Sequence, residues 1–290
     1  MKWLLTGGAG FIGCNTASKL LKEGQEVIVF DNLSRSGADV NLAWLKDQGL
    51  RTFIHGDVRD ARQVDDVFRT HRDIGVVLHL AAQVAVTTSV RHPREDFEVN
   101  ALGTFNVCEA VRQCAPQAIL LNASTNKVYG ELEHVHVVER NGRYAYADLP
   151  GGVPETAPLD FHSPYGCSKG AADQYVKDYA RIYGLRTVTF RQSCIYGTRQ
   201  FWIEDQGWVA WFAIAAVRES PITVYGDGKQ VRDVLFIDDL VQCYFRAVER
   251  IEQAAGQVYN IGGGPGQTLA VSECLQRLER LLGRRAQGSA

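Results

Sequence analysis

The chain has 290 residues, of which 46% are hydrophobic, and its formal net charge is −2. This length and composition allow a sizeable core and predict one large domain or two interlocked ones. The near-neutral charge and the scattered lysines and arginines argue against nucleic-acid binding. The longest apolar stretch, Trp208 to Val217, is too short to span a bilayer, so we expect a buried helix there and no membrane association.

The seven cysteines lie singly along the chain, and none forms a Cys-x-x-Cys pair. An odd number of isolated cysteines predicts neither a disulfide framework nor a zinc site, and it favours the reducing cytoplasm. The histidines add no metal-binding pattern, because the one close pair, His134 and His136, has the spacing of an alternating strand or loop. We therefore expect a cytoplasmic protein without a bound metal.

Short apolar runs alternate with helical patterns through much of the chain. The runs that indicate buried strands lie at residues 3–5, 27–30, 52–54, 76–80, 118–121 and 187–190. The helical segments lie at residues 12–23, 61–72, 96–114 and 164–183. Strands that are apolar throughout and separated by helices indicate βαβ units. The predicted fold class is therefore α/β, a Rossmann-type doubly wound parallel sheet.

The pattern changes twice in the second half of the chain. Residues 131–162 are crowded with Gly, Pro, Asp and Tyr and predict a long loop, of a kind that is often functional. Beyond residue 191 the elements become shorter, which predicts a smaller, interlocked substrate-binding lobe. We expect a cofactor-binding Rossmann domain at 1–190 and the lobe at 191–290, with residues 234–262 returning to the Rossmann domain.

A glycine-rich segment directly follows the first expected strand. Gly7, Gly10 and Gly13 have the spacing G-x-x-G-x-x-G and open the first expected helix. They permit a tight turn, a close approach to a pyrophosphate and close packing of helix on sheet, and the helix N-terminus attracts anions. Asp31, after the second strand, is placed to bind ribose hydroxyls and repel a 2′-phosphate, which favours NAD over NADP. A plain loop aspartate is the alternative, and the nearby Arg35 would tolerate a phosphate.

Further residues complete the predicted cofactor site. Asp57, after the third strand, is placed to hydrogen-bond the adenine amine, and the small residues Ala81 and Ala82 after the fourth strand would let a flat cofactor lie close. The remaining members of the predicted set are Phe11, Ile12, Asn32, Ser34, Arg35, Val58, Leu80, Gln83, Asn100, Tyr165, Lys169 and Arg191.

A catalytic pair is predicted at the start of the helix over 164–183. Tyr165 and Lys169 are four residues apart and therefore lie on one face of that helix. A free tyrosine has a pKa of about 10, and a nearby ammonium favours its phenolate form, so the pair suits a general base. Thr125 follows the fifth strand, at the edge of the sheet where ligands gather, and its hydroxyl can donate to a substrate oxygen.

Together these residues resemble the extended short-chain dehydrogenase/reductase family over nearly the whole chain. The resemblance rests on Gly7-x-x-Gly10-x-x-Gly13, Gly56-Asp57-Val58-Arg59-Asp60, His79-Leu80-Ala81-Ala82, Tyr165-x-x-x-Lys169 and residues 226–233. It implies a tightly held NAD, a nucleotide-sugar substrate and a homodimer or homotetramer formed through the helices at 96–114 and 164–183. It also implies catalytic roles for Thr125, Tyr165 and Lys169, and a diphosphate contact for Arg232.

Within this family the chain is most similar to the CDP-tyvelose 2-epimerases, also called CDP-paratose 2-epimerases. The likeness lies in residues 30–35, 124–130, 160–175, 199–201 and 205–209. The substrate site that it implies consists of Thr88, Thr125, Asn126, Arg199, Gln206, Val209, Tyr225, Gln230 and Arg232. For Thr88 a helix cap is the simpler alternative, and for Arg199 a solvated loop.

Two features depart from the resemblance. The chain stops earlier than such enzymes usually do, so we expect part of the lobe to be missing. Cys194 stands where many relatives carry an asparagine, so phosphate contacts are not carried over at this position.

The residues after Thr125 distinguish between reactions. Nucleotide-sugar dehydratases of this family carry Asp-Glu there, and these carboxyls eliminate water, whereas this chain has Asn126-Lys127. We therefore expect epimerisation at C2 of a CDP-sugar through a transient keto-sugar, with hydride removed and returned by NAD. A UDP-sugar 4-epimerase is the alternative within enzymes, and a non-catalytic NAD-binding sensor is the alternative outside them.

Overall fold

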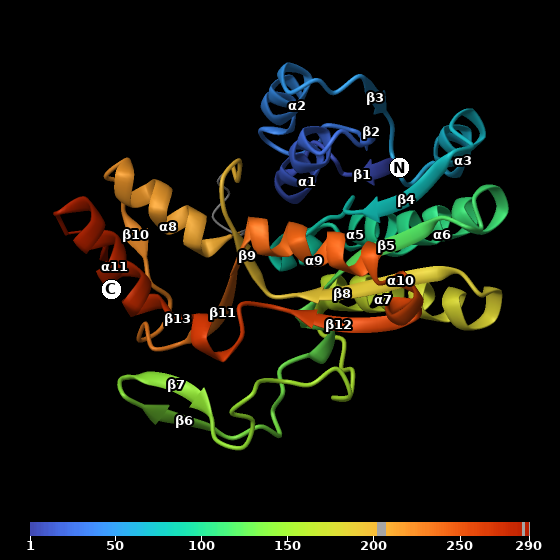
Figure 1. Ribbon diagram of the computed structural model, residues 1–290. Helices are drawn as coiled ribbons and strands as arrows, with labels where there is room; N and C mark the ends of the chain where they lie inside the picture. Colours follow the sequence, from blue (N-terminus) through green and yellow to red (C-terminus); the bar gives the residue numbers. More distant parts are fainter. Residues whose placement is uncertain (202–206, 286–287, 290) are drawn as a thin grey trace.

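The structure is a computed structural model that describes residues 1–201, 207–285 and 288–289 (Figure 1). Seven parallel strands form one sheet in the order β12-β8-β5-β4-β1-β2-β3. The strands are β1 (Lys2–Thr6), β2 (Glu26–Asp31), β3 (Thr52–His55), β4 (Ile74–His79), β5 (Ile119–Thr125), β8 (Arg186–Gln192) and β12 (Gln257–Ile261). The predicted doubly wound parallel sheet is confirmed.

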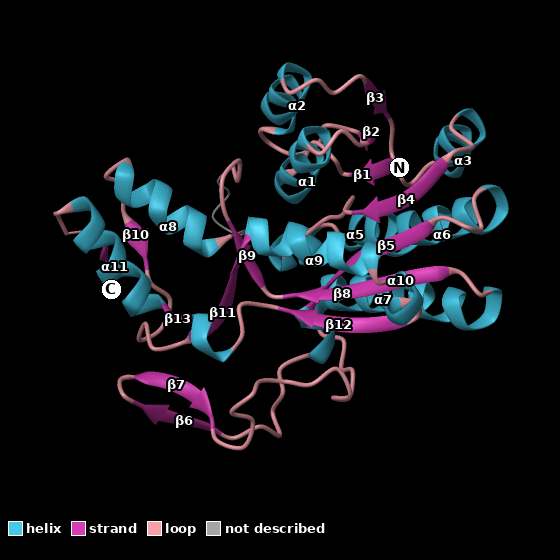
Figure 2. Cartoon of the chain, in the orientation of Figure 1, coloured by secondary structure: helices cyan, strands magenta, loops and turns pink. Residues whose placement is uncertain are grey.

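Helices cover both faces of this sheet (Figure 2). Because successive strand residues point to opposite faces, Leu5 joins a core with Leu20 and Leu240, while Leu4 joins a second core with Val176. The first face packs against α1 (Phe11–Lys22), α2 (Ala38–Asp47) and α9 (Ile237–Glu249), and the second against α3 (Ala61–Thr70), α6 (Gly103–Cys114) and α7 (Ser163–Tyr183). Shorter helices are α4 (Val86–Arg91), α10 (Ile251–Ala254), the 3₁₀-helix Asn126–Tyr129 and the 3₁₀-helix Pro265–Gln267.

The helix predicted over 96–114 is not one regular α-helix. It begins earlier, as α5 (Pro93–Phe97), continues as a π-helix over Glu98–Leu102, and ends as α6. The hydroxyl of Thr104 donates a hydrogen bond of 2.6 Å to the carbonyl of Asn100, so a side chain satisfies this oxygen of the widened turn. The apolar pattern did not reveal the π-turn, because one inserted residue changes the helical period only locally.

A smaller body follows β8. It contains a three-stranded sheet in the order β13-β11-β9, the pair β10 and β14, and two helices, with Phe212, Ile222, Val234, Leu269 and Cys274 in its core. Its elements are β9 (Cys194–Tyr196), α8 (Trp208–Val217), β10 (Ile222–Thr223), β11 (Val231–Phe236), β13 (Thr268–Ala270), α11 (Val271–Leu282) and β14 (Gly288–Ser289). Helix α8 has the predicted bounds, but most of its side chains are only half-buried.

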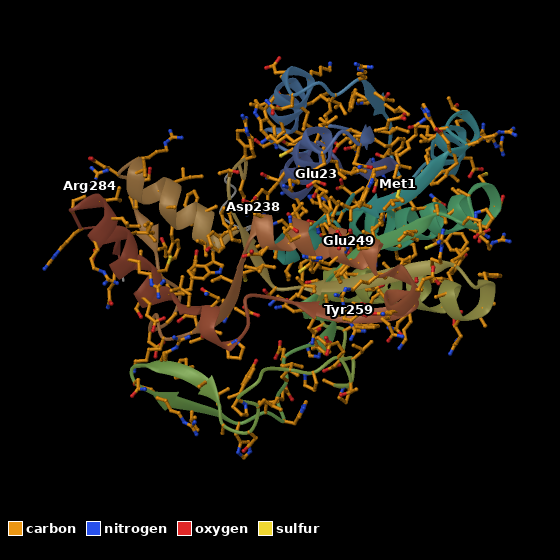
Figure 3. All side chains as sticks on the ribbon, in the orientation of Figure 1. Met1, Glu23, Asp238, Glu249, Tyr259 and Arg284 are labelled. Carbon is orange, nitrogen blue, oxygen red and sulfur yellow. The ribbon has the colours of Figure 1, made fainter. Side chains whose placement is uncertain are left out.

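In the described residues, two crossings between the bodies have no linker, whereas residues 262–267 connect β12 of the large sheet to β13 of the small one. A single residue separates β8, which ends at Gln192, from β9, which begins at Cys194. Strand β11 ends at Phe236 and α9 begins at Ile237, so the chain passes directly from the small sheet to a helix that packs on the large one. Figure 3 marks the two ends of α9 with Asp238 and Glu249, and Tyr259 on β12.

The segment 131–162, predicted as a loop, contains a β-hairpin. Strands β6 (Val137–Arg140) and β7 (Arg143–Tyr146) pair antiparallel around Asn141-Gly142, both of which have a positive φ. Asn-Gly is a strong signal for such a turn, so the sequence did contain the information that the prediction missed. The hairpin contacts the small body: the Tyr144 amide donates to the Lys229 carbonyl at 3.0 Å, and Arg143 pairs with Glu273 at 3.3 Å. Figure 2 shows it apart from the seven-stranded sheet.

Among the helices of the described residues, none is long and apolar enough to cross a membrane.

The packing of α9 against the sheet generates a stability prediction. Leu240 is fully buried in the first core, so Leu240→Ala should lower the free energy of unfolding by about 2–5 kcal/mol, because it removes apolar contacts and leaves a cavity. Urea unfolding followed by circular dichroism measures this loss. Leu281→Ala on α11, where the side chain is 83% exposed, is the matched control and should change the value by no more than about 0.5 kcal/mol. Equal losses in the two variants would contradict the packing described.

Candidate active site

The predicted site residues gather at the carboxyl ends of the central strands. Strands β1 and β4 are neighbours in the sheet, and from them the strand order proceeds in opposite directions. Such a switch point leaves a crevice outside the strand ends, where ligands bind in doubly wound sheets. Gly7 follows β1, Leu80 follows β4 and Thr125 ends β5, so the topology brings these three positions to one edge.

The turn after β1 requires glycine. Gly7 has a φ of +67°, and a Cβ atom there would lie 2.7 Å from the amide nitrogen of Ala81. A Cβ atom on Gly13 would lie 2.5 Å from the Gly7 carbonyl oxygen. Gly10 is the N-cap residue of α1, and no side chain caps this helix. The uncapped amides at the first turn, near Phe11 and Ile12, suit a phosphate group.

Asp31 closes this turn from the end of β2. Its Oδ2 accepts a hydrogen bond from the Ala9 amide at 2.9 Å, and its Oδ1 accepts one from the Leu33 amide at 2.8 Å. Burial raises its pKa, and these two amides act in the opposite direction. Each carboxylate oxygen can accept more than one hydrogen bond, so Asp31 retains the capacity to bind a ribose. Ser34 and Arg35 follow in the same loop, where the Ser34 amide donates to Asn32 Oδ1 at 3.0 Å.

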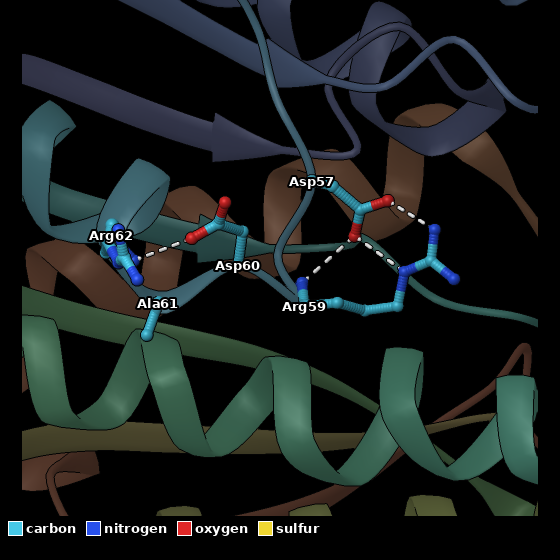
Figure 4. Close-up of a pocket in the computed structure, with 5 residues that line it drawn as sticks. All are labelled: Asp57, Arg59, Asp60, Ala61 and Arg62. Atoms are coloured by element: carbon cyan, nitrogen blue, oxygen red, sulfur yellow. Dashed lines mark hydrogen bonds and ion pairs between the residues drawn. The ribbon is translucent and has the colours of Figure 1, made fainter.

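Asp57 lies in an open hollow beside α3 (Figure 4), lined by Asp57, Arg59, Asp60, Ala61 and Arg62. Arg59 donates to both of its carboxylate oxygens, at 3.0 and 2.7 Å, and Asn32 Nδ2 donates to Oδ2 at 2.9 Å. Burial alone would raise the pKa of Asp57, but the Arg59 and Asn32 hydrogen bonds bring it to about 2. Asp57 is therefore anionic at neutral pH. Arg59, which the prediction did not include, is its principal partner.

The segment after β4 is joined to the π-helix. The Gln83 amide donates to Asn100 Oδ1 at 3.0 Å, and Asn100 Nδ2 donates back to the Gln83 carbonyl at 3.0 Å. Leu80, Ala81 and Ala82 are only half-buried, so this segment is accessible from the crevice. The side chain of Val58, by contrast, is buried in the second core, so only its backbone could face a cofactor.

Thr125, Tyr165 and Lys169 come together between β5 and α7. Burial raises the pKa of Tyr165 to about 12, while a hydrogen bond from Thr125 lowers it and the charge of Asp96 raises it. Burial lowers the pKa of Lys169 to about 8, against the charges of Asp173 and Asp96. Lys169 Nζ donates to the Ala123 carbonyl at 2.5 Å. Burial is the dominant effect on both groups in the protein alone.

The Arg191 side chain is engaged inside the protein, so only its backbone could reach a cofactor at the predicted site. Its guanidinium pairs with both carboxylate oxygens of Asp173 at 2.9 Å and donates to the Tyr129 hydroxyl at 2.9 Å. Both members of this ion pair are fully buried beneath α7. Arg191 thus anchors the helix that carries Tyr165 and Lys169. Its position at the end of β8 suggested the crevice, but in a strand the side chain points to one face of the sheet.

The predicted substrate residues lie in several different parts of the structure. Arg199 lies over the ring of Trp44 at 4.2 Å, on the side of α2, where Asn41 Nδ2 donates to the Ala9 carbonyl at 3.1 Å. This places Arg199 beside the glycine turn. Gln206 lies outside the described residues. The others are Thr88 on α4, the exposed Asn126 after β5, Val209 on α8, and Tyr225, Gln230 and Arg232 around the start of β11.

Two cations approach Cys194 from different elements. Burial raises the pKa of the Cys194 thiol, while Trp208 and the charges of Arg232 and Lys127 act to lower it. Lys127 belongs to the 3₁₀-helix that follows Thr125 and is exposed, as is Arg232 on β11. An ammonium and a guanidinium that both act on this position are suited to bind a diphosphate. The prediction missed Lys127, although its charge next to Asn126 was visible in the sequence.

Among the described residues, no three His, Cys, Asp or Glu side chains gather to hold a metal ion.

The ion pair beneath α7 generates a second stability prediction. Arg191→Met should lower the free energy of unfolding by about 3–5 kcal/mol, because it leaves the Asp173 carboxylate buried without its cation. Chemical denaturation measures the loss. Arg246→Met is the matched control, since the exposed pair of Arg246 and Glu249 is worth about 0–1 kcal/mol. A loss below about 1 kcal/mol in Arg191→Met would show that the pair does not anchor the helix.

Comparisons with known proteins agree with this geometry. A model of the NAD dependent epimerase/dehydratase family matches residues 3–262. The chain is 49% identical over 284 residues to a CDP-paratose 2-epimerase of Salmonella typhi, covering 96% of this chain and 84% of that protein. It is 31% identical over 284 residues to a putative UDP-glucose 4-epimerase of Methanocaldococcus jannaschii, covering 98% and 83%.

A solved structure gives the same result. The UDP-glucose 4-epimerase of Thermus thermophilus, in complex with NAD, matches with a TM-score of 0.82 and 34% identity, covering all of this chain and 86% of that one. As the resemblance to the extended short-chain dehydrogenases/reductases predicted, the chain belongs to the NAD dependent epimerase/dehydratase family of enzymes.

Proposed function

We propose that the protein is an NAD-dependent 2-epimerase of a CDP-sugar of the paratose and tyvelose type. The observation that carries the proposal is that Thr125, Tyr165 and Lys169 lie together between β5 and α7. In the sequence, Thr125 is followed by Asn126 and Lys127 and not by a pair of carboxylates. The identity of 49% with a CDP-paratose 2-epimerase supports the sugar and the nucleotide. We assign NAD to the crevice outside β1 and β4, and the nucleotide-sugar to the region between the large sheet and the small body.

The residues of the crevice fit NAD. The uncapped first turn of α1 would hold the pyrophosphate, and Asp31 would hold the ribose hydroxyls next to the adenine. The buried carboxylate of Asp31 also disfavours a 2′-phosphate at that ribose, which supports NAD rather than NADP. Bound in this crevice, NAD would supply the hydride acceptor and donor of the reaction.

In the proposed reaction, side chains of this protein transfer protons, stabilise charge and hold the substrate. Tyr165 takes the proton of the sugar hydroxyl that is oxidised, and it returns a proton when the carbonyl is reduced. The Thr125 hydroxyl donates to the same substrate oxygen and stabilises charge there. Lys169, as an ammonium, favours the phenolate of Tyr165 by its charge. Arg232 and Lys127 hold the diphosphate while the keto-sugar turns, so that its opposite face meets the returning hydride.

A UDP-sugar 4-epimerase is the second candidate. The identities of 31% and 34% with UDP-glucose 4-epimerases support it, because the same three side chains can oxidise either hydroxyl. The candidates differ in the base on the nucleotide and in the carbon that is inverted.

Proton NMR of substrate mixtures in deuterated buffer tests the proposal. The purified protein is incubated with CDP-paratose, CDP-glucose and UDP-glucose. We expect inversion at C2 of CDP-paratose with its C2 proton retained, because the hydride returns to the carbon that it left. Inversion at C4 of UDP-glucose would replace the proposal with the second candidate, and turnover of no sugar would contradict both.

The matched variant for this experiment is Tyr165→Phe. Loss of the proton acceptor should lower kcat by at least about 10²-fold, while NAD stays bound. Tyr175→Phe, on the exposed face of the same helix, should retain the wild-type rate.

We also propose that two copies of the chain associate through α6 and α7. Large apolar side chains are exposed along these helices, and the rings of Phe105 and Tyr175 contact each other at 5.7 Å. The exposed set is Phe105, Tyr175, Ile182 and Tyr183, with Phe97 on the neighbouring α5. An exposed apolar area of this kind on two long helices suits a dimer interface.

The free thiols of all seven cysteines support a reducing, cytoplasmic location.

Sedimentation velocity at micromolar concentration tests the association. We expect a dimer or tetramer for the wild type and a shift toward monomer for Tyr175→Lys, because the charge would be buried in the interface. Val137→Lys, an exposed position on the β6–β7 hairpin, should leave the association unchanged. A wild type that sediments only as a monomer would contradict the proposed interface.

A further inference from the structure

A buried carboxylate, Asp96, is hydrogen-bonded to the turn of α7 that carries Tyr165 and Lys169, the two side chains that the proposed function uses for proton transfer. Asp96 of α5 is 0% exposed. Its Oδ2 accepts a hydrogen bond from Ser168 Oγ at 2.5 Å, and its Oδ1 accepts from Gln83 Nε2 at 2.8 Å and Asn100 Nδ2 at 3.1 Å. Burying a carboxylate is costly unless hydrogen bonds compensate it, and here three neutral donors do so. No step of the proposed reaction uses this group.

The three donors come from three different segments. Ser168 lies on α7 between Tyr165 and Lys169, Gln83 lies in the segment after β4, and Asn100 lies in the π-helix. Asn100 Nδ2 also donates to Ser168 Oγ at 3.1 Å. Asp96 therefore ties the catalytic turn of α7 to the segment that faces the crevice.

The same hydrogen bonds continue to the glycine turn. The Thr104 hydroxyl donates to the Asn100 carbonyl, and the ring of His79 is hydrogen-bonded to Thr104 at 3.0 Å and to Thr6 at 2.7 Å. Thr6 is the last residue of β1, directly before Gly7. A continuous buried network thus joins the start of the glycine turn to the turn of α7 that carries Tyr165.

The charge of Asp96 acts on both members of the pair. It raises the pKa of Tyr165, since it disfavours the phenolate, and it raises the pKa of Lys169, since it favours the ammonium. A second carboxylate, Asp173 of α7, also acts on Lys169, but Arg191 of β8 neutralises its charge. His79 of β4 is neutral, because burial and the charge of Lys169 lower its pKa to about 3.

We propose that Asp96 is a positioning residue of this enzyme, which fixes the Tyr165–Lys169 turn to the cofactor segment and holds Lys169 as an ammonium. The inference rests on the proposed roles of Tyr165 and Lys169. Activity requires Tyr165 to lose its proton and Lys169 to keep its own. Removing the charge of Asp96 makes both groups more acidic, so both limbs of the pH profile should move in the same direction.

The variant Asp96→Asn removes the charge and keeps the shape. Its amide oxygen can accept from Gln83 and Asn100, and its amino group can donate to Ser168, whose own proton can turn to the Tyr165 carbonyl at 3.2 Å. We expect the ascending and descending limbs of kcat/KM against pH to shift to lower pH. Glu95→Gln removes the same charge from an exposed position of the same helix and should leave both limbs in place.

A second readout needs no turnover. In protein labelled with ¹³C at the tyrosine ζ-carbon and loaded with NAD, the signal of Tyr165 is identified by its absence in Tyr165→Phe. Its titration midpoint should be lower in Asp96→Asn than in the wild type. If the wild type turns over no sugar, the proposed function fails, yet this titration still tests Asp96.

The outcomes separate a positioning role from a structural one. A lower kcat in Asp96→Asn with both limbs and the Tyr165 midpoint unchanged would overturn the proposal, because loss of structure alone does not change the proton affinities in this way. If Asp96→Asn does not fold, as judged by thermal melting, Asp96→Ser is the second neutral variant, with the same expected shifts to lower pH. Unshifted limbs in Asp96→Ser would overturn the proposal equally.

Discussion

The position of α7 depends on one buried ion pair. Asp173 and Arg191 are both excluded from solvent, and together they fix α7 to β8. Ser124 Oγ donates to Asp173 at 2.8 Å, so the same carboxylate also ties α7 to β5. These two neighbouring strands therefore hold the helix that carries Tyr165 and Lys169. Buried charges are costly, and this pair is tolerated because hydrogen bonds satisfy both partners.

The fold followed from the sequence because its signals were local. Each strand of the large sheet from β1 to β8 is an apolar run, and α1, α3, α6 and α7 overlap predicted helical segments, whereas α2, α9 and α11 were not predicted. The glycine turn and Asp31 were found because their spacing reflects a backbone that only glycine permits. Strand β12 had only a coarse prediction, since Tyr259 and its neighbours are half-buried and give a weak apolar pattern. The β6–β7 hairpin was missed although Asn141-Gly142 indicates its turn.

The site was predicted less completely because it depends on which way side chains point. Arg191 and Arg199 were both assigned to ligands, but one is used for a buried ion pair and the other lies on Trp44. Asp96 is buried and belongs to no short motif, and Lys127 lies in the run 124–130 but was given no role there. Their importance comes from residues distant in sequence: Ser168 for Asp96, and Cys194 with Arg232 for Lys127. Such proximity is a property of the tertiary structure.

The absence of a linker at two of the crossings between the bodies has a consequence for how this enzyme can change. A domain joined by a flexible connector can be exchanged by recombination, since each part folds separately. Here one residue separates β8 from β9, and none separates β11 from α9. Any exchange of the small body would cut a strand junction and a helix start of the large one. New specificities are therefore accessible through individual substitutions and through the hairpin over 137–146, which contacts the small body through the Tyr144–Lys229 backbone hydrogen bond and through side chains such as Arg143.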